Sequence, residues 1–282
     1  MSNRFVGRNA IVTGGSRGIG AALAERLAAE GASVVIAART LDRHDHLAGS
    51  LNETVERCRR YGTTVEAVVA DLADDTSRAT IVPRALEVFD GRVDILVNNA
   101  AAAVYQSTLD YSLRRRRVMF EVNVEAPIDL TQAVVPTMIE QGEGWIVNLS
   151  SATARHAPGP PYRTGGVHSV IGVYGATKAA LNRITHAFAV ELFGTGIRIN
   201  TIEPRAAVMS EGAEALVGGM VGDESIESME AMVEGTLVLC DCPVERTGGV
   251  HVSLDLLDEL GLTVMTIDGS APYPGGQRVV RT

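Results

Sequence analysis

The sequence predicts an α/β protein built on one doubly wound parallel sheet, with helices on both faces. Short apolar runs rich in Val and Ile alternate with longer stretches of helical periodicity from the N-terminus almost to the end of the chain. A glycine-rich turn stands directly between the first apolar run and the first helical stretch. With 282 residues and 46% hydrophobic content, the chain can bury one large core, so we expect a single domain over 1–282.

Each predicted element follows from its own pattern. Six runs are apolar throughout and short enough for strands that are buried on both faces. The predicted strands are 9–13, 33–37, 65–69, 94–98, 144–149 and 197–202. The stretches between them carry apolar residues at helical spacing. The predicted helices are 18–30, 47–61, 75–89, 112–140 and 174–193.

Two stretches are predicted to be loops. Segment 152–173 contains APGPPYRTGG, so we expect an irregular surface segment over one end of the sheet. In segment 205–224, Gly212, Gly218, Gly219 and Gly222 interrupt the apolar pattern, which indicates a mobile flap.

The C-terminal part is less regular. A helix is expected near 225–239, and the last strand could be 249–254 or 262–267. We favour the first, because Thr247 and Gly248 can turn the chain into it. Residues 255–282 would then form a C-terminal extension.

Composition restricts the partners and the compartment. A net charge of -9 argues against nucleic acid, because phosphate binding relies on concentrated Lys and Arg. No apolar run has the length of a signal peptide or a membrane span, and three cysteines without zinc spacing fit reduced thiols. We therefore expect a soluble cytoplasmic protein that acts on a small molecule.

The residues from Thr13 to Gly20 read TGGSRGIG, directly after a strand and before an alanine-rich helix. Glycines permit a tight turn and close approach of the backbone to a ligand. The N-terminus of the following helix offers free N–H groups and a partial positive charge to a pyrophosphate. The turn therefore predicts a dinucleotide-binding site, although a simple strand-to-helix turn is the alternative.

The second predicted strand ends in VIAART, which places Arg39 where NAD-binding proteins usually carry an acidic residue. A guanidinium binds a phosphate dianion through paired hydrogen bonds, so Arg39 and Arg17 could together hold a 2'-phosphate. Either arginine could instead be a solvated surface charge. The pattern favours NADP(H), with NAD(H) as the alternative. We expect no metal, because the cluster DRHDH at 42–46 resembles metal ligands in composition only.

Polar residues collect where the predicted strands end. Asp71 and Asn98 each follow a strand, and Ser150 and Ser151 close another. In an open parallel sheet these ends share one edge, where ligands bind. Asn123 lies inside a predicted helix although asparagine is a poor helix former. Capping or turn hydrogen bonds would explain any one of these residues alone.

Tyr174 and Lys178 stand four residues apart in a predicted helix and share one face. An ammonium beside the phenol would favour its ionised form, and a phenol with a reference pKa of about 10 needs such help near neutral pH. A surface pair is the alternative. It is weakened because Lys178 is the one lysine of the chain, where every other basic side chain of this kind is arginine.

Together, TGGSRGIG, Asp71, NNA, Asn123, Ser151 and YGATK resemble the short-chain dehydrogenase/reductase family, in this order and over about the first 205 residues. The resemblance implies a Rossmann-like fold with about seven strands and a homodimer or homotetramer. It also implies Tyr174 as general acid/base, with Lys178 lowering its pKa and holding the nicotinamide ribose.

Further roles come from the same resemblance. Ser151 would orient the substrate oxygen, and Asn123 would hold a water in a proton relay. The positions that the resemblance assigns to the cofactor are Gly14, Ser16, Arg17, Gly18, Ile19, Gly20, Arg39, Asp71, Leu72, Asn98, Ala100, Tyr174, Lys178 and Pro204.

Three features depart from the family pattern. The segment between Ser151 and Tyr174 is longer than usual, Pro204-Arg205 replaces the usual Pro-Gly, and a tail follows the terminal strand. This arrangement resembles a hydroxysteroid-dehydrogenase-like branch.

The expected function is an NADP(H)-dependent oxidoreductase that acts on a carbonyl or alcohol carbon of a moderately apolar small molecule. Two alternatives remain open on the same fold. One is a nucleotide-sensing binding protein, and the other is an epimerase or dehydratase with tightly bound nucleotide.

Overall fold

A computed structural model describes residues 3–43, 46–162, 169–205, 207–217 and 226–277. Seven strands form one parallel sheet in the order β3-β2-β1-β4-β5-β6-β9. These strands are β1 (Asn9–Thr13), β2 (Ser33–Ala38), β3 (Val65–Val69), β4 (Ile95–Asn98), β5 (Gly144–Leu149), β6 (Ile197–Glu203) and β9 (Val250–Val252). The predicted doubly wound sheet is confirmed, and its strand order reverses between β1 and β4, where such sheets bind ligands.

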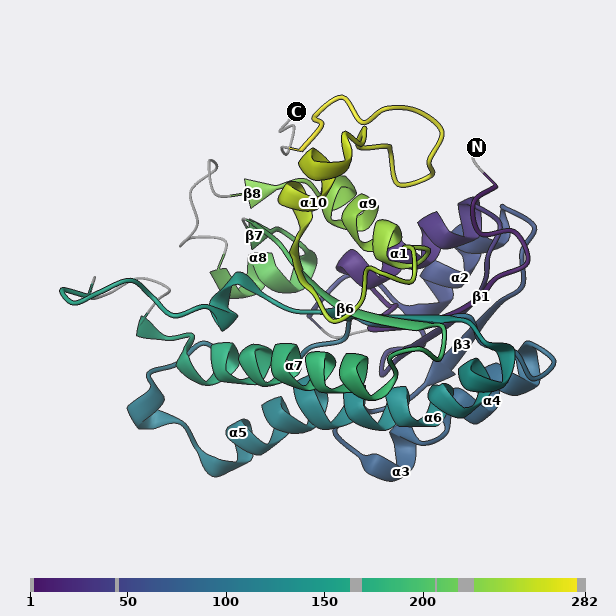
Figure 1. Cartoon of the computed structure of the whole chain (residues 1–282). Helices are drawn as coiled ribbons and strands as arrows, with labels where there is room; N and C mark the ends of the chain where they lie inside the picture. Colours follow the sequence, from purple (N-terminus) through teal and green to yellow (C-terminus); the bar gives the residue numbers. More distant parts are fainter. Residues whose placement is uncertain (1–2, 44–45, 163–168, 206, 218–225, 278–282) are drawn as a thin grey trace.

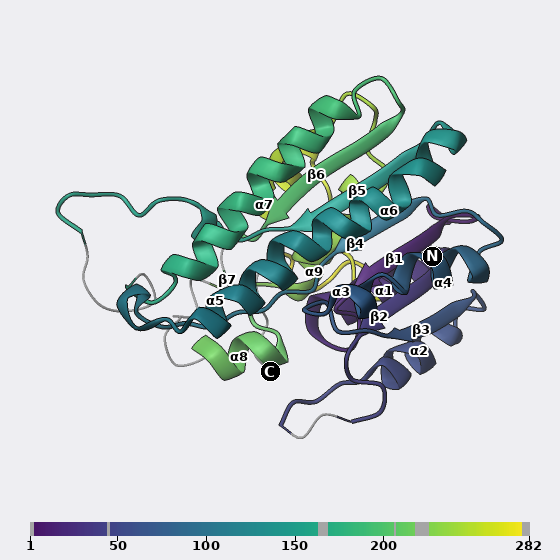
Figure 2. The same ribbon diagram turned by 90° about the horizontal axis from the view of Figure 1, so that it is seen from below.

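Helices cover both faces of the sheet (Figures 1 and 2). One face carries α1 (Gly18–Ala29), α2 (Leu51–Arg59), α9 (Met229–Leu239) and α10 (Ser253–Leu260). The other carries α3 (Asp75–Arg78), α4 (Ile81–Val88), α5 (Leu113–Phe120), α6 (Ala126–Gln141) and α7 (Gly172–Glu191). Each layer buries its own apolar cluster against the sheet.

Two predicted helices are divided in the structure. The predicted helix 75–89 is two helices, α3 and α4, because Pro83 has no N–H and its ring would clash with the carbonyl of Ala79 in a continuous helix. The predicted helix 112–140 is interrupted by a π-helical turn, Glu121–Glu125. Such turns often occur at functional sites, and this one contains Asn123.

The prediction that segment 205–224 lacks regular elements is wrong for its described part. It contains β7 (Ala207–Val208), which pairs with β8 (Ile226–Glu227), and helix α8 (Glu211–Val217). Val208 and Ile226 are both buried, which gives the short pair an apolar contact to fold around.

Within segment 152–173, a 3-10 turn occupies Ala152–Ala154 and α7 already begins at Gly172. Residues 155–162 extend away from the body of the molecule (Figure 1). Several predictions lie outside the described residues, namely those on 44–45, 163–168, Gly218, Gly219, Gly222 and 278–282.

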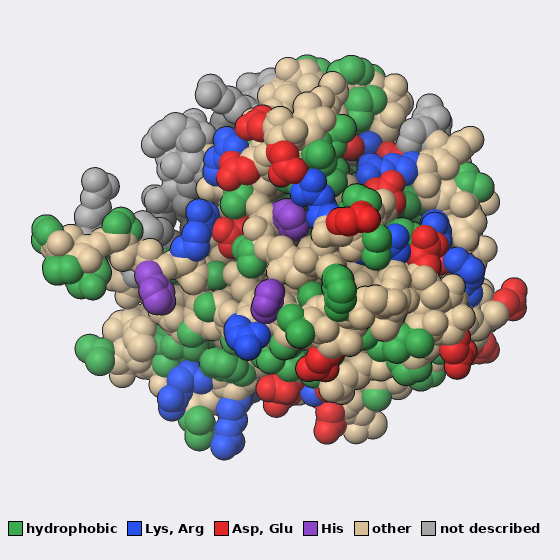
Figure 3. All heavy atoms as spheres, in the orientation of Figure 1, with side chains coloured by type: hydrophobic (Ala, Val, Ile, Leu, Met, Phe, Trp, Pro, Cys, Tyr) green, Lys and Arg blue, Asp and Glu red, His purple; other side chains and the backbone are tan. Residues whose placement is uncertain are grey.

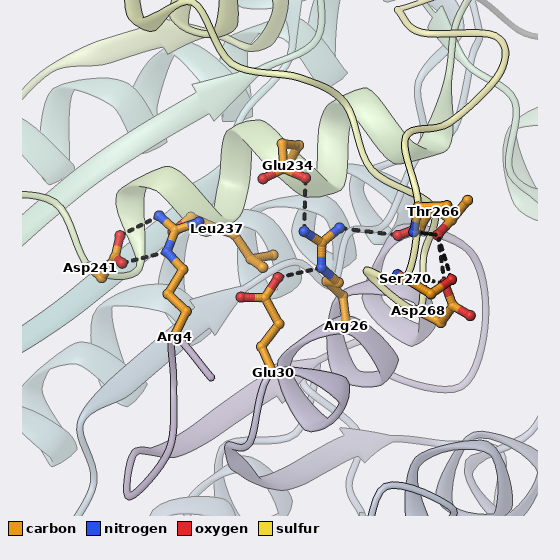
Figure 4. Close-up of polar contacts among 10 residues, drawn as sticks. Arg4, Arg26, Glu30, Glu234, Leu237, Asp241, Thr266, Asp268 and Ser270 are labelled. Atoms are coloured by element: carbon orange, nitrogen blue, oxygen red, sulfur yellow. Dashed lines mark hydrogen bonds and ion pairs between the residues drawn. The ribbon is translucent and has the colours of Figure 1, made fainter. Parts of the chain in front are cut away.

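The last strand is β9, so the preference for 249–254 over 262–267 is confirmed. In the second stretch, Met265 makes an isolated bridge with Pro272. The chain after α10 packs across α1 and α9 (Figures 1 and 4). There Arg26 bonds the Thr266 carbonyl at 3.1 Å and forms ion pairs with Glu30 at 2.5 Å and Glu234 at 2.9 Å.

The face drawn in Figure 3 carries acidic and basic side chains interspersed, in keeping with 34 acidic and 25 basic residues in the chain. Among the residues that the structure describes, no helix is both long enough and apolar enough to cross a membrane.

Candidate active site

The glycine-rich turn lies between β1 and α1, at the carboxyl edge of the sheet. Gly18 has φ +55°, a left-handed conformation that favours glycine. A Cβ on Gly20 would collide with the carbonyl of Gly14 and with the Asn99 side chain. α1 begins without a side-chain cap at Arg17, so its N-terminus can receive an external anion.

Thr13 connects this turn to the end of β4. Its hydroxyl accepts hydrogen bonds from the backbone N–H groups of Asn99 and Ala100, each at 3.1 Å. The Asn99 side chain donates to the Thr13 carbonyl at 2.7 Å. Thr13 and Asn99 belong to the motifs TGGSRGIG and NNA, but the sequence did not predict that these two residues bond each other. Their contacts bring Asn98 and Ala100 to the glycine turn.

At the predicted adenosine end, the two arginines are placed differently. Arg39 is exposed just after β2. Arg17 bonds the carbonyl oxygens of Ala48 and Gly49, through Nε at 2.8 Å and Nη2 at 2.9 Å. The Arg17 guanidinium is therefore partly engaged by the chain, whereas Arg39 projects into solvent.

Asp71 stabilises the turn after β3, since its carboxylate accepts from the N–H of Ala73 at 3.0 Å. Leu72 is buried in the apolar cluster beneath that turn. Asn98 donates to the Asn148 side chain at 2.8 Å, while its own oxygen is buried without a hydrogen-bond partner among the described residues. Asp71 therefore makes the turn hydrogen bond that was the alternative to a ligand role. Asn98 bonds a neighbouring strand through its nitrogen, while its oxygen remains without a partner among the described residues.

Tyr174 lies in the first turn of α7 and is only 9% exposed. The ring of Tyr105 packs against it with a centroid distance of 5.7 Å. Burial raises the pKa of Tyr174 well above its ordinary value, the neighbouring Tyr105 adds to the rise, and a hydrogen bond with Ser151 opposes it.

Lys178 is buried, with 2% of its surface exposed. Its Nζ donates to the carbonyl of Leu149 at 2.7 Å and lies 5.9 Å from the centroid of the Tyr174 ring. Burial lowers the pKa of Lys178 to about 8. In the protein alone the cation is directed at a carbonyl, and desolvation of the phenol is the largest influence on the pKa of Tyr174. That this ammonium lowers the pKa of Tyr174 stays a prediction.

Ser151 follows β5 and caps the 3-10 turn. Its hydroxyl accepts from the N–H of Thr153 at 3.2 Å and from the Thr153 hydroxyl at 2.9 Å. The neighbouring Ser150 hydroxyl is buried and has no partner among the described residues. Since Ser151 is the serine that bonds Tyr174, the structure brings Ser151, Tyr174 and Lys178 together at the end of β5.

Asn123 is held inside the π-helical turn by both ends of its side-chain amide. Its oxygen accepts from the N–H of Ala102 at 2.8 Å, and its nitrogen donates to the Ala102 carbonyl and the Thr177 hydroxyl, each at 2.9 Å. Thr177 in turn donates to the carbonyl of Tyr174 at 2.7 Å. Thr177 was not predicted from the sequence, although it stands beside Lys178 and is fully buried.

The segment after β6 reaches back to the glycine turn. The N–H of Arg205, next to Pro204, donates to the Glu227 carboxylate at 2.8 Å. At the start of α8, the Ser210 Cβ would lie 2.8 Å from a Cβ placed on Gly18. The segment containing α8 therefore covers the beginning of α1.

The sequence of this chain is similar to those of known dehydrogenases. The family model described as short chain dehydrogenase matches residues 8–215. The chain is 34% identical over 200 residues to the L-rhamnose 1-dehydrogenase (NADP(+)) of Thermoplasma acidophilum, covering 71% of this chain and 72% of that protein. It is 28% identical over 271 residues to hydroxysteroid dehydrogenase-like protein 2 of Mus musculus, covering 96% of this chain and 53% of that protein, so it spans about half of that relative.

The fold is also similar to solved structures of short chain dehydrogenases. A short chain dehydrogenase of Mycobacterium thermoresistibile superposes with a TM-score of 0.79 at 28% identity, covering 98% of this chain and 95% of that one. A short chain dehydrogenase of Burkholderia cenocepacia in complex with NADP superposes with a TM-score of 0.73 at 30% identity, covering 88% and 97%.

Proposed function

Because the chain belongs to the short chain dehydrogenase family and is an oxidoreductase of alcohol or carbonyl carbons, we propose that it moves a hydride between NADP(H) and a moderately apolar small molecule. The observation that carries the proposal is the meeting of Ser151, Tyr174 and Lys178 at the carboxyl edge of the sheet. The hydroxysteroid-dehydrogenase-like relative supports the branch inferred from the long loop, Pro204-Arg205 and the C-terminal tail.

The glycine turn fits a dinucleotide. Its backbone leaves no room for side chains at Gly20, and the uncapped start of α1 suits a pyrophosphate. Ser16, Arg17, Gly18 and Ile19 would line this phosphate site. When bound, the nicotinamide supplies or accepts the hydride.

Tyr174 would transfer the proton that accompanies the hydride. In the reduction direction its hydroxyl donates a proton to the carbonyl oxygen, and in the oxidation direction its oxygen takes that proton back. With a pKa above its ordinary value, the phenol of Tyr174 is protonated at neutral pH, which is the form that the reduction direction requires. Ser151 would hold the substrate oxygen within reach of the phenol.

Lys178 would serve in two ways. Its ammonium, fixed by Leu149, places a positive charge beneath the Tyr174 ring, where a forming tyrosinate would be stabilised. Its two remaining N–H donors could hold ribose hydroxyls. Asn123 would support the same turn of α7 through Thr177.

The exposed Arg39 supports NADP(H) over NAD(H), because it can pair with a 2'-phosphate that NADH lacks. A relative and a solved structure named with NADP agree with this preference. Segment 152–173 would border the substrate and 205–224 would act as a movable flap. The three buried, unpaired cysteines support a reducing compartment such as the cytoplasm, and the family supports a homodimer or homotetramer.

A turnover screen tests the proposal. Purified protein is incubated with NADPH and a panel of aldehydes, ketones, quinones, steroids and acyl ketones, and loss of NADPH absorbance is followed. At least one carbonyl should be reduced by the native protein and not by Tyr174→Phe. Equal rates for the two proteins would contradict the role of Tyr174.

A further inference from the structure

Glu203, the last residue of β6, holds a carboxylate in an unusual place. The residue is 1% exposed and lies at the sheet edge where the candidate site forms. One carboxylate oxygen, Oε1, pairs with Nε of Arg155 at 3.0 Å. The other, Oε2, is buried without a hydrogen-bond partner among the described residues. A buried charge of this kind costs solvation and calls for a role beyond stability.

Arg155 belongs to the segment that carries Ser151. It directly follows the 3-10 turn, and its N–H donates to the Ala152 carbonyl at 3.2 Å. The turn is pressed against α7, since a Cβ on Gly175 would collide with the Thr153 carbonyl. Beyond Arg155 the chain leaves the body of the molecule (Figure 1). Among the described residues up to 162, no hydrogen bond or ion pair to the body of the molecule follows this pair with Glu203.

We propose that Glu203 is a positioning residue: by holding Arg155, it keeps the segment from Ser151 to Arg155 packed on the turn of α7 that carries Tyr174. This inference rests on the proposed roles of Ser151 and Tyr174. The start of the long loop is then held in place, and residues 156–162 can contact the substrate.

Arg205, which follows Pro204, attaches the end of β6 to a different part of the chain. Arg205 pairs with Asp255 through Nε at 2.7 Å and with Asp258 through Nη2 at 3.1 Å, both in α10. The sequence Glu-Pro-Arg thus ties the end of β6 to two separate parts of the chain. Glu203 faces the Ser151 segment, whereas Arg205 faces the C-terminal helix, so the two side chains can be tested against each other.

The ion pair between Arg155 and Glu203 is expected to contribute more to the position of the loop than to the stability of the fold. The Arg155 side chain is 59% exposed, so solvent screens much of the attraction. Burial raises the pKa of Glu203 and Arg155 lowers it, as expected for a carboxylate held in place by one partner. A pair that contributes little to stability can still restrict where a loop begins.

The experiment uses Glu203→Gln, which removes the charge and keeps the shape, in the full chain. Trypsin cleaves after arginine, so releasing Arg155 should speed cleavage of the bond between Arg155 and His156 by about tenfold or more. Mass spectrometry measures the rate of cleavage at this bond and compares it with the rate at the bond after the exposed Arg59. Glu66→Gln is the matched control, because it alters a partly exposed carboxylate in β3 that pairs with Arg84 at 2.8 Å.

Steady-state kinetics and NADPH binding provide a second measurement. With NADPH and the best carbonyl from the screen, Glu203→Gln should lower kcat about tenfold, because a small displacement of Ser151 misaligns the substrate oxygen. The dissociation constant of NADPH should stay within about twofold. Arg155→Lys should keep nearly full activity, and Arg155→Met should repeat the loss. Arg205→Gln should leave cleavage after Arg155 unchanged.

Unchanged cleavage and unchanged kcat in Glu203→Gln would overturn the proposal. An equal loss of NADPH affinity and kcat in that variant would also overturn it, because the residue would then support the fold at large. If Glu203→Gln does not fold, the comparison of Arg155→Lys with Arg155→Met decides, since Arg155 is exposed. Failure of the hydride-transfer proposal would be seen separately, as no turnover by the native protein, while the cleavage rates still test the anchor.

Discussion

The ammonium of Lys178 donates a hydrogen bond of 2.7 Å to the carbonyl oxygen of Leu149, the last residue of β5. This contact fixes the one lysine of the chain beneath the Tyr174 ring, at the residue that precedes the two serines in sequence. A compact cation at this point leaves two donors for a ligand.

Replacing Lys178 should therefore affect chemistry more than folding. We expect Lys178→Met and Lys178→Arg each to lower turnover at neutral pH by about a hundredfold or more, a typical general acid–base contribution. Arginine is expected to fail because its wider planar group cannot take the place of Nζ without displacing its neighbours. Steady-state kinetics measure the effect, with exposed Arg183→Met on the same helix as control. Full activity in Lys178→Arg would contradict the assigned role.

The burial of Lys178 also predicts a dependence of stability on pH. Its pKa is lowered to about 8 in the folded protein from an ordinary value of 10.5. Between these two values the unfolded chain binds more protons at this site, so the free energy of unfolding should rise with pH relative to Lys178→Met. Urea unfolding at pH 7.5, 8.5 and 9.5 measures the difference. A constant difference across this range would show that Lys178 keeps its ordinary pKa.

Cofactor preference should depend on Arg39. NADPH should bind at least about tenfold more tightly than NADH, a difference of ~1.4 kcal/mol. Arg39→Asp should remove this preference, because a carboxylate repels the 2'-phosphate and accepts ribose hydroxyls. Fluorescence titration of both cofactors measures this preference, with Arg59→Asp at an exposed position of α2 as control. Equal affinities in the native protein would rule out the assignment.

The loop between the serine and the tyrosine should control substrate choice. Replacing 156–170 with a short linker retains the Arg155–Glu203 pair and the start of α7. The ranking of carbonyl substrates should change, while NADPH affinity stays nearly the same, because the glycine turn is untouched. A collapse of cofactor binding would instead assign the loop a structural role.

The cluster in Figure 4 should matter for stability alone. Arg26 is 3% exposed and pairs with the buried carboxylates of Glu30 and Glu234. Arg26→Met leaves both without this partner, so we expect a loss of about 3–5 kcal/mol in the free energy of unfolding. Exposed Arg59→Met should change it by less than about 0.5 kcal/mol. Similar losses in the two variants would show that the cluster contributes little.

Local patterns determined much of this protein. Apolar runs identified the strands of the sheet, and TGGSRGIG identified the turn before α1, because burial and backbone geometry act on neighbouring residues. The spacing of Tyr174 and Lys178 placed them on one helix for the same reason. The doubly wound sheet followed from the alternation alone.

Tertiary structure decided what local patterns could not. The π-helical turn at Asn123 forms where its amide meets Ala102. Lys178 turns to Leu149, and Glu203 meets Arg155 across 48 positions of sequence. Such contacts depend on which chain segments the sheet brings together, and the pKa values follow from the burial that results. Periodicity along a chain carries no information about that burial until the strands are in their final order.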